Sequence, residues 1–431
     1  MTQPKETART VAYQTNPGTG PRAVLPGVSV PVSQLADPDR FGGTATGDLR
    51  CGTLCLAPDG TAHLEPSGSD STNRYIVLPR LTEAHVHLDK CHSIGRLGDV
   101  GGDLAAALAA QRRDKRNWTA DDLRTRMQRG LTELRQAGCG ALRTHIDWAT
   151  GTDHPDTPLA WDIMADLSAA ARDAGITVQA AALTGIDEMA TPGAAQAVAR
   201  RVARDGGALG SFLLSHANMR AGLRALFDAA THFGLPLDFH VDEGLDPTLD
   251  GLGLIADIAP ETGFEGPILC GHACSLAVRD TDDLQRTADK LAHAGIAVAA
   301  LPSTNLYLRG RRGGTPTARG ITMLHELDQA GVQTIIGTDN VRDAFCPIGR
   351  HDPIWSLGLA VLTGHLDPPF GAHLKTITTH PRSAMGLTPL SVDTAAPSEL
   401  IAFPAADLSE LLTGAAQPVP LTDLLTETRH D

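Results

Sequence analysis

The central part of the chain alternates apolar runs with segments of helical periodicity. Residues 103–137 carry apolar side chains at helical spacing, and Gly138 to Gly140 ends that pattern. Two further helices are predicted over 161–174 and 194–205. The apolar runs of strand length are 141–147, 176–183, 211–216, 237–243, 267–272, 296–301 and 333–339.

One more strand is predicted before these seven. The run from Tyr75 to Leu78, followed by Pro79, is apolar and is expected to be a buried strand that leads into the stretch Arg80 to Lys90. With it, the chain has eight strand–helix units. Alternation of this kind favours a parallel sheet with crossover helices, and eight units favour a closed (β/α)8 TIM barrel over residues 80–385.

The two ends of the chain differ from this centre. Residues 1–79 and 386–431 are rich in turn-forming residues and contain only short apolar pieces, for example Ala23 to Leu25 and Leu400 to Phe403. We therefore expect the N-terminal and C-terminal segments to form a small β-sandwich domain together, with the barrel between them.

Composition and charge narrow the classes of function. The 431 residues carry a net charge of −14, which argues against a nucleic-acid partner. No apolar run approaches the ~18 residues of a membrane span, and Met1 to Gly20 has no apolar signal segment. The seven scattered cysteines are expected to be reduced. These features predict a soluble, cytoplasmic protein that acts on a small molecule.

The candidate chemistry begins with His85 and His87. Residues two apart on a strand point to the same face, so the two imidazoles can coordinate one metal ion together. The alternative is that two polar residues simply cap a strand. Other polar side chains follow the predicted strands at the end where a barrel places its active site, namely His145 and Asp147, His216, His240 and Glu243, His272, and Asp339 with Asn340.

Four of these residues suit one metal ion. His85, His87, His240 and Asp339 supply three imidazoles and a carboxylate, a set that fits zinc or iron with a position left for water, and manganese is a third candidate. A second metal would need a bridging carboxylated lysine from a middle strand. No lysine occurs between Lys115 and Lys290, so a single ion is expected.

The remaining residues then take chemical roles. Asp339 can also accept a proton from the metal's water, Glu243 can act as proton shuttle to the substrate, and His272 can stabilise developing charge. The alternatives are a surface carboxylate for Glu243 and a core histidine for His272. His145, Asp147 and His216 are expected to be hydrogen-bonding residues at the barrel mouth rather than ligands.

An ordered set of motifs resembles a known family. The segments are His85 to Asp89, Leu142 to Asp147, His240 to Glu243, Gly271-His272, Pro302 to Arg309, Gly337 to Asn340, Asp343, Pro347 to Gly349 and Thr379-His380. Together they are similar to the cytosine-deaminase branch of the amidohydrolase superfamily. The resemblance implies one divalent metal on His85, His87, His240 and Asp339, an acid–base Glu243, a second catalytic His272, and hydrolytic loss of an amine from a heterocycle.

Departures from this family bear on the substrate. Leu183 stands where cytosine deaminases carry a glutamine that hydrogen-bonds the pyrimidine, and Phe345 stands where they carry a tryptophan. Asn340 and Lys90 are more similar to the relatives that hydrolyse N-isopropylammelide. Lys90 is expected either to contact an anionic or carbonyl-rich edge of the substrate or to pair with a neighbouring carboxylate.

The sequence thus predicts a metal-dependent hydrolase that uses water to cleave an exocyclic C–N bond on a small nitrogen heterocycle. A first alternative is hydrolysis of a cyclic amide or lactone at the same site. Two alternatives from other classes are a non-haem iron oxygenase and a non-catalytic binding protein. The family resemblance also leads us to expect a homo-oligomer.

Overall fold

The structure, a computed structural model, describes residues 23–57, 61–66, 73–148 and 158–426. The N-terminal segment, expected to carry no signal sequence, lies outside these residues. The described chain divides into two compact units. One consists of residues 23–80, 368–375 and 390–426, and the other of residues 81–367 and 376–389.

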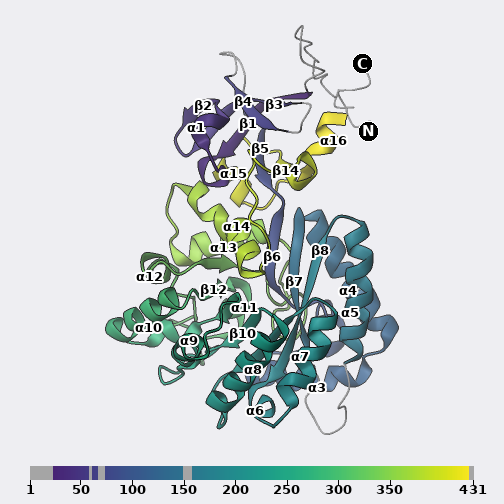
Figure 1. The fold of residues 1–431 in the computed structure, drawn as a ribbon, viewed down its shortest axis with the longest axis vertical. Coiled ribbons are helices and arrows are strands. Elements are labelled where there is room, and N and C mark those ends of the chain that lie inside the picture. The colour runs from purple at the N-terminus through teal and green to yellow at the C-terminus, as the bar shows by residue number, and fades with distance from the viewer. Residues whose placement is uncertain (1–22, 58–60, 67–72, 149–157, 427–431) are drawn as a thin grey trace. The chain divides into compact units, whose positions relative to one another are not determined.

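The larger unit is built on parallel strands that follow one another in chain order (Figure 1). They are β6 (Leu81–Val86), β7 (Cys139–Asp147), β8 (Thr177–Gly185), β9 (Ala208–Leu213), β10 (Leu237–Val241), β11 (Ile268–His272), β12 (Ala297–Ala300) and β13 (Thr334–Ile336). A parallel bridge between Val86 and Asp339 joins the two ends of this eight-stranded sheet. The predicted (β/α)8 barrel is confirmed.

Helices alternate with the barrel strands. They are α2 (Ile94–Leu97), α3 (Leu104–Asp114), α4 (Ala120–Gln136), α5 (Leu159–Asp173), α6 (Ile186–Met189), α7 (Ala194–Arg204), α8 (Met219–Phe233), α9 (Gly251–Thr262), α10 (Thr281–His293), α11 (Pro302–Leu308), α12 (Leu324–Gln329), α13 (Pro353–Gly364) and α14 (Thr379–Ala384). The stretch 103–137, expected as one helical segment, is two helices. The chain is extended at Trp118 and Thr119, and the Thr119 hydroxyl caps α4 by accepting a hydrogen bond from Asp122 N.

The smaller unit contains one β-sheet. Its strands are β1 (Ala23–Pro31), β2 (Thr44–Thr46), β3 (Leu49–Leu56), β4 (Ala62–Glu65), β5 (Tyr75–Pro79), β14 (Leu400–Phe403) and β15 (Val419–Pro420). The C-terminal β14 pairs antiparallel with β5, with Ile401 opposite Leu78. Three short helices accompany the sheet, α1 (Pro38–Phe41), α15 (Leu408–Leu412) and α16 (Leu421–Thr426). The N- and C-terminal segments therefore both contribute strands to this unit, and these strands form a single sheet.

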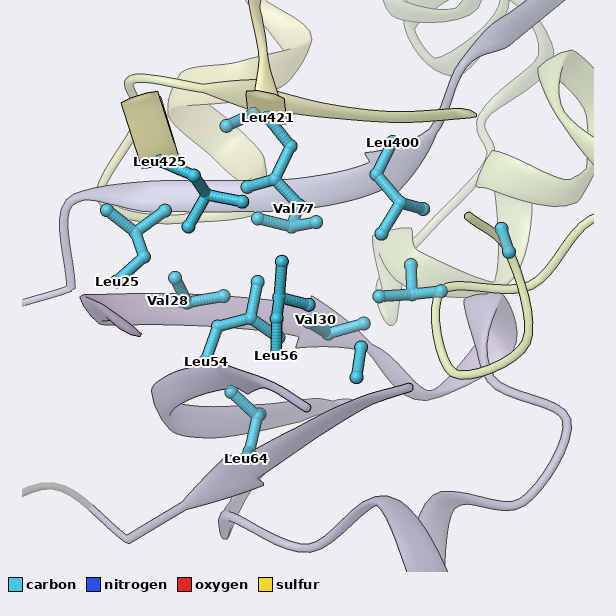
Figure 2. Packing of buried hydrophobic residues seen from close by; sticks show 14 of the residues in the cluster. Leu25, Val28, Val30, Leu54, Leu56, Leu64, Val77, Leu400, Leu421 and Leu425 are labelled. Atoms are coloured by element: carbon cyan, nitrogen blue, oxygen red, sulfur yellow. The ribbon is translucent and has the colours of Figure 1, made fainter. Parts of the chain in front are cut away.

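The core of the smaller unit corrects one expectation. The strand at Tyr75–Pro79 was expected to lead directly into the metal-binding stretch, but β5 belongs to the small sheet. Its Val77 packs with Val28 and Val30 from β1 and with Leu400 and Leu421 (Figure 2). The barrel begins only at Leu81, where β6 pairs with β7. The apolar sequence of these residues does not indicate that the consecutive strands β5 and β6 belong to different sheets.

No helix in the described parts of the chain is long and apolar enough to cross a membrane.

Candidate active site

The four residues expected to bind a metal lie together at the carboxyl ends of the barrel strands. His85 is in β6, His87 follows it, His240 is in β10, and Asp339 follows β13. Asp339 Oδ1 is 3.5 Å from His85 Nε2 and 3.3 Å from His87 Nε2, and the Nε2 atoms of His87 and His240 are 3.0 Å apart. All four side chains are buried.

These side chains fit a metal ion in spacing and protonation. Ligand bonds of about 2.1 Å in a tetrahedral arrangement place donor atoms about 3.4 Å apart. Burial lowers the pKa of His87 and of His240 well below the usual range, so both rings are neutral. Burial opposes ionisation of Asp339, but the adjacent His85 and His87 hold its pKa well below normal. No described residue hydrogen-bonds to either ring nitrogen of His85 or to either carboxylate oxygen of Asp339.

The backbone around this cluster is specialised. Asp339 and His272 have φ values of 56° and 73°, a left-handed conformation that is uncommon for residues other than glycine and is often found at functional sites. Gly271 faces His85 across the barrel, and a Cβ atom there would lie 2.6 Å from His85 Cε1. A glycine at position 271 therefore makes room for the His85 ring.

Glu83 joins the two strands that present His85 and Asp339. Its carboxylate accepts hydrogen bonds from His85 N at 2.8 Å and from Thr338 N at 2.9 Å. Burial raises the pKa of Glu83 to about 7. Sequence reasoning missed this residue, although a glutamate inside a buried strand two positions before the first histidine was a visible sign.

The three residues expected at the barrel mouth, His145, Asp147 and His216, have different surroundings in the structure. His145 is buried beside the metal-binding cluster, with Nε2 2.8 Å from Asp238 Oδ1, and burial lowers its pKa to about 4. Asp147 forms ion pairs with Lys90 at 2.8 Å and with Lys115 at 2.7 Å. His216 lies beyond the end of β9 and accepts a hydrogen bond from Leu214 N.

Glu243 and His272 lie beside each other. His272 Nε2 is 3.8 Å from Glu243 Oε2, while His272 Nδ1 is 3.1 Å from Asn305 Oδ1. The other carboxylate oxygen, Oε1, accepts a 2.5 Å hydrogen bond from Arg309, whose second terminal nitrogen also donates to the Glu243 carbonyl. Glu243 is buried, so it is not a surface carboxylate. Arg309 ends the segment Pro302 to Arg309 that resembles the family, but the sequence alone indicated no role for it.

A pocket of about 230 Å³ opens beside this cluster. Its lining includes the four residues expected to contact substrate, Lys90, Leu183, Asn340 and Phe345. Lys90 Nζ pairs with Asp147 and lies 3.2 Å from His87 Nδ1, and the Asn340 amide donates to Asp343. The wall also contains residues that the sequence had not indicated, among them Gln111, Trp148 and Phe212.

The fold and the site together define a class, a (β/α)8 barrel with a histidine–carboxylate site for a divalent metal at the ends of its strands. The sequence model of the amidohydrolase family matches residues 95–390. A pterin deaminase from Rhizobium rhizogenes (strain K84) is 36% identical over 361 residues, which span 83% of this chain and 81% of that protein. The chain therefore belongs to the amidohydrolase family.

Solved structures share the fold. The 5-methylcytosine deaminase from Klebsiella pneumoniae, liganded with phosphonocytosine, is 22% identical with a TM-score of 0.74, and covers 90% of this chain and 95% of its own. The N-isopropylammelide isopropylaminohydrolase from Burkholderia multivorans is 18% identical with a TM-score of 0.66, and covers 93% and 97%. Membership of the amidohydrolase superfamily is confirmed, and the protein is an enzyme that hydrolyses carbon–nitrogen bonds.

Proposed function

We propose that this enzyme deaminates a 2-amino-4-oxopteridine (pterin), replacing the exocyclic amino group with oxygen and releasing ammonia. The observation that carries the proposal is the 36% identity to a pterin deaminase over 83% of this chain. The pocket supports it, because Leu183, Phe212 and Phe345 offer apolar surface for a flat ring system. At about 230 Å³ the pocket suits a small ring system rather than a drug-sized ligand.

His85, His87, His240 and Asp339 are the residues that would hold the metal, which we propose is one zinc or iron ion, with manganese as a third candidate. When bound, such an ion lowers the pKa of water so that hydroxide forms near neutral pH. The neutral rings of His87 and His240 and the ionised Asp339 support this assignment.

The protein side chains then move protons. Asp339 accepts the proton of the attacking water, and Glu243 delivers a proton to the ring nitrogen next to the carbon that is attacked. His272, oriented through Asn305, hydrogen-bonds the attacking oxygen. The ring C–NH₂ bond breaks as the amine takes up the proton held by Asp339 and leaves as ammonia. The remaining proton of the attacking oxygen passes to Glu243 as the new C=O bond forms, which restores the proton that Glu243 delivered. Arg309 holds the Glu243 carboxylate, so the shuttle is fixed before substrate arrives.

The alternatives from the sequence receive less support. A pocket without hydrogen-bonding groups near Leu183 would have favoured a cyclic amide or lactone, but Gln111, Asp147 and Thr184 share its wall. Glu243 and His272 have no evident role in iron oxygenation. A cytoplasmic location is part of the proposal and is supported by the seven cysteines, none of which forms a disulfide.

Ammonia release by the metal-reconstituted enzyme tests the proposal. The substrate panel is pterin, cytosine, 5-methylcytosine, isocytosine, creatinine, ammelide and N-isopropylammelide. We expect pterin to be turned over, with one ammonia per 2,4-dioxopteridine formed. No ammonia from pterin, by enzyme with about one metal ion bound per chain, would refute the proposed substrate.

A further inference from the structure

We propose that Gln111, on helix α3, is a specificity-determining residue that binds the amide edge of the heterocycle, the ring N–H and its neighbouring C=O. The identity of that heterocycle as a pteridine rests on the proposed function. The recognition group itself is inferred from the wall of the pocket.

Helix α3 presents one of its faces to the pocket. Leu104, Leu108 and Gln111 recur at helical spacing and all line the cavity. The small residues Ala107 and Ala110 pack in a core cluster with Leu308 and Phe345, and Leu104 and Leu108 pack against the same cluster. This packing anchors α3 against the barrel, so the position of Gln111 in the wall is set by the fold rather than by a mobile loop.

The Gln111 side chain is buried without a hydrogen-bond partner. The residue is only 3% exposed, and no described residue hydrogen-bonds to its amide oxygen or to its amide nitrogen. A buried amide left in this way is unfavourable, because it has lost its hydrogen bonds to water. Such a group is retained where a ligand or bound water supplies the missing bonds, and its place in the pocket wall favours the ligand.

Other polar side chains of the pocket wall already have partners. Asp147 pairs with Lys90 and Lys115, and the Asn340 amide donates to Asp343. The Thr184 hydroxyl donates to the Gly210 carbonyl. Gln111 differs from these residues, because both its donor and its acceptor are open.

The chemistry of the amide selects the partner. A glutamine offers one donor and one acceptor side by side, which complements a ring segment –NH–C(=O)– with two parallel hydrogen bonds. A 2-amino-4-oxopteridine carries this segment at N3 and C4. Leu183 cannot read such an edge, since its side chain has neither donor nor acceptor. We infer that recognition of the oxo edge comes from the helix after the first barrel strand and not from the end of the third strand.

Equilibrium binding tests this role independently of turnover. The ligands are 2,4-dioxopteridine, which keeps the amide edge and is not deaminated, and 2-methylpteridine, which has neither the amide edge nor an amino group. The variant Gln111→Met preserves side-chain volume and removes both hydrogen-bonding atoms. We expect it to weaken dioxopteridine binding by about 10-fold or more and to leave 2-methylpteridine binding unchanged, with the same loss in kcat/KM for pterin. Gln128→Met, at an exposed position on α4, is the control and should change neither.

The outcomes separate this inference from the proposed function. Equal weakening of both ligands, or a lower melting temperature for the metal-loaded Gln111→Met enzyme, would show a structural role and overturn the inference. Unchanged dioxopteridine binding would overturn it as well. Gln111-dependent binding by an enzyme that does not deaminate pterin would support the inference and refute the function. A wild-type enzyme that binds neither pteridine would overturn both.

Discussion

Individual side chains at this site are held in position by their neighbours. Glu243 illustrates this, because one carboxylate oxygen is held by Arg309 and the other faces His272. Replacing Glu243 with glutamine keeps the shape but removes the proton-carrying carboxylate. We expect Glu243→Gln to keep its metal and to lose about 10²–10⁴-fold in kcat, measured by metal analysis and ammonia release. Near-normal turnover would show that another group carries the proton.

Arg309 is expected to act through Glu243. Arg309→Met should leave the metal content unchanged and lower kcat more than it raises KM, because the carboxylate loses the group that orients it. Steady-state kinetics on pterin would measure the two constants. Arg311→Met is a matched control, since Arg311 is exposed and stacks on Tyr307 instead. Equal effects of the two substitutions would argue against the positioning role.

Secondary-structure elements control the site through the ends of the barrel strands. At Gly271, near the end of β11, an added Cβ would lie 2.6 Å from His85 Cε1 in β6. We expect Gly271→Ala to displace the His85 ring and to weaken metal affinity by about 10–100-fold, as measured by competition with a chelator. Gly95 has no described atom within 4 Å of an added Cβ, so Gly95→Ala should bind metal normally. Unchanged affinity in Gly271→Ala would mean that His85 is not a ligand.

At the scale of the whole molecule, the metal is expected to tie distant parts of the barrel together. The proposed ligands come from β6, β10 and the segment after β13, so a bound ion links three parts of the barrel. Removing the ion should lower the free energy of unfolding by about 3 kcal/mol when the wild-type enzyme is measured with metal at roughly 100 times its dissociation constant. His240→Ala is the comparison, because its melting temperature should respond much less to a chelator. The same response in both would count against His240 as a ligand.

The smaller unit depends on chain segments that are far apart in sequence. Leu400 is 1% exposed and packs with Val28 and Val77. Leu400→Ala should lower stability by about 2–5 kcal/mol in denaturant unfolding, because it leaves a cavity in this core. Leu362 is 75% exposed, so Leu362→Ala should change stability by less than about 0.5 kcal/mol. A small effect at Leu400 would mean that this core contributes little to the measured unfolding transition.

Much of the architecture was predictable from local patterns. Apolar runs of strand length, separated by helical periodicity, indicated the eight-strand barrel, and turn-rich ends indicated a small β unit. The break at Thr119 and the assignment of β5 to the other sheet were not predictable in this way. A threonine cap depends on local backbone geometry. The sequence of an apolar strand does not specify which strand it pairs with.

Candidate residues for the site were also visible in the sequence, because polar side chains at the ends of parallel strands must converge on one edge of a barrel. His85, His87, His240, Asp339, Glu243 and His272 were all chosen on that basis, and the structure brings them together. Their mutual distances could not be predicted. Neither could the position of Glu83 between two strands, nor the contact of Arg309 with Glu243, since both depend on residues far apart in the chain.

The sequence by itself therefore determined the class of the fold, the approximate positions of the barrel strands and the residue types available for chemistry. These properties follow from short-range periodicity and from the rule that side chains alternate along a strand. The tertiary structure alone decided which side chains share a pocket and which polar groups are left without a partner. Gln111 is the example, because its burial and its open amide arise only when α3 packs on the barrel.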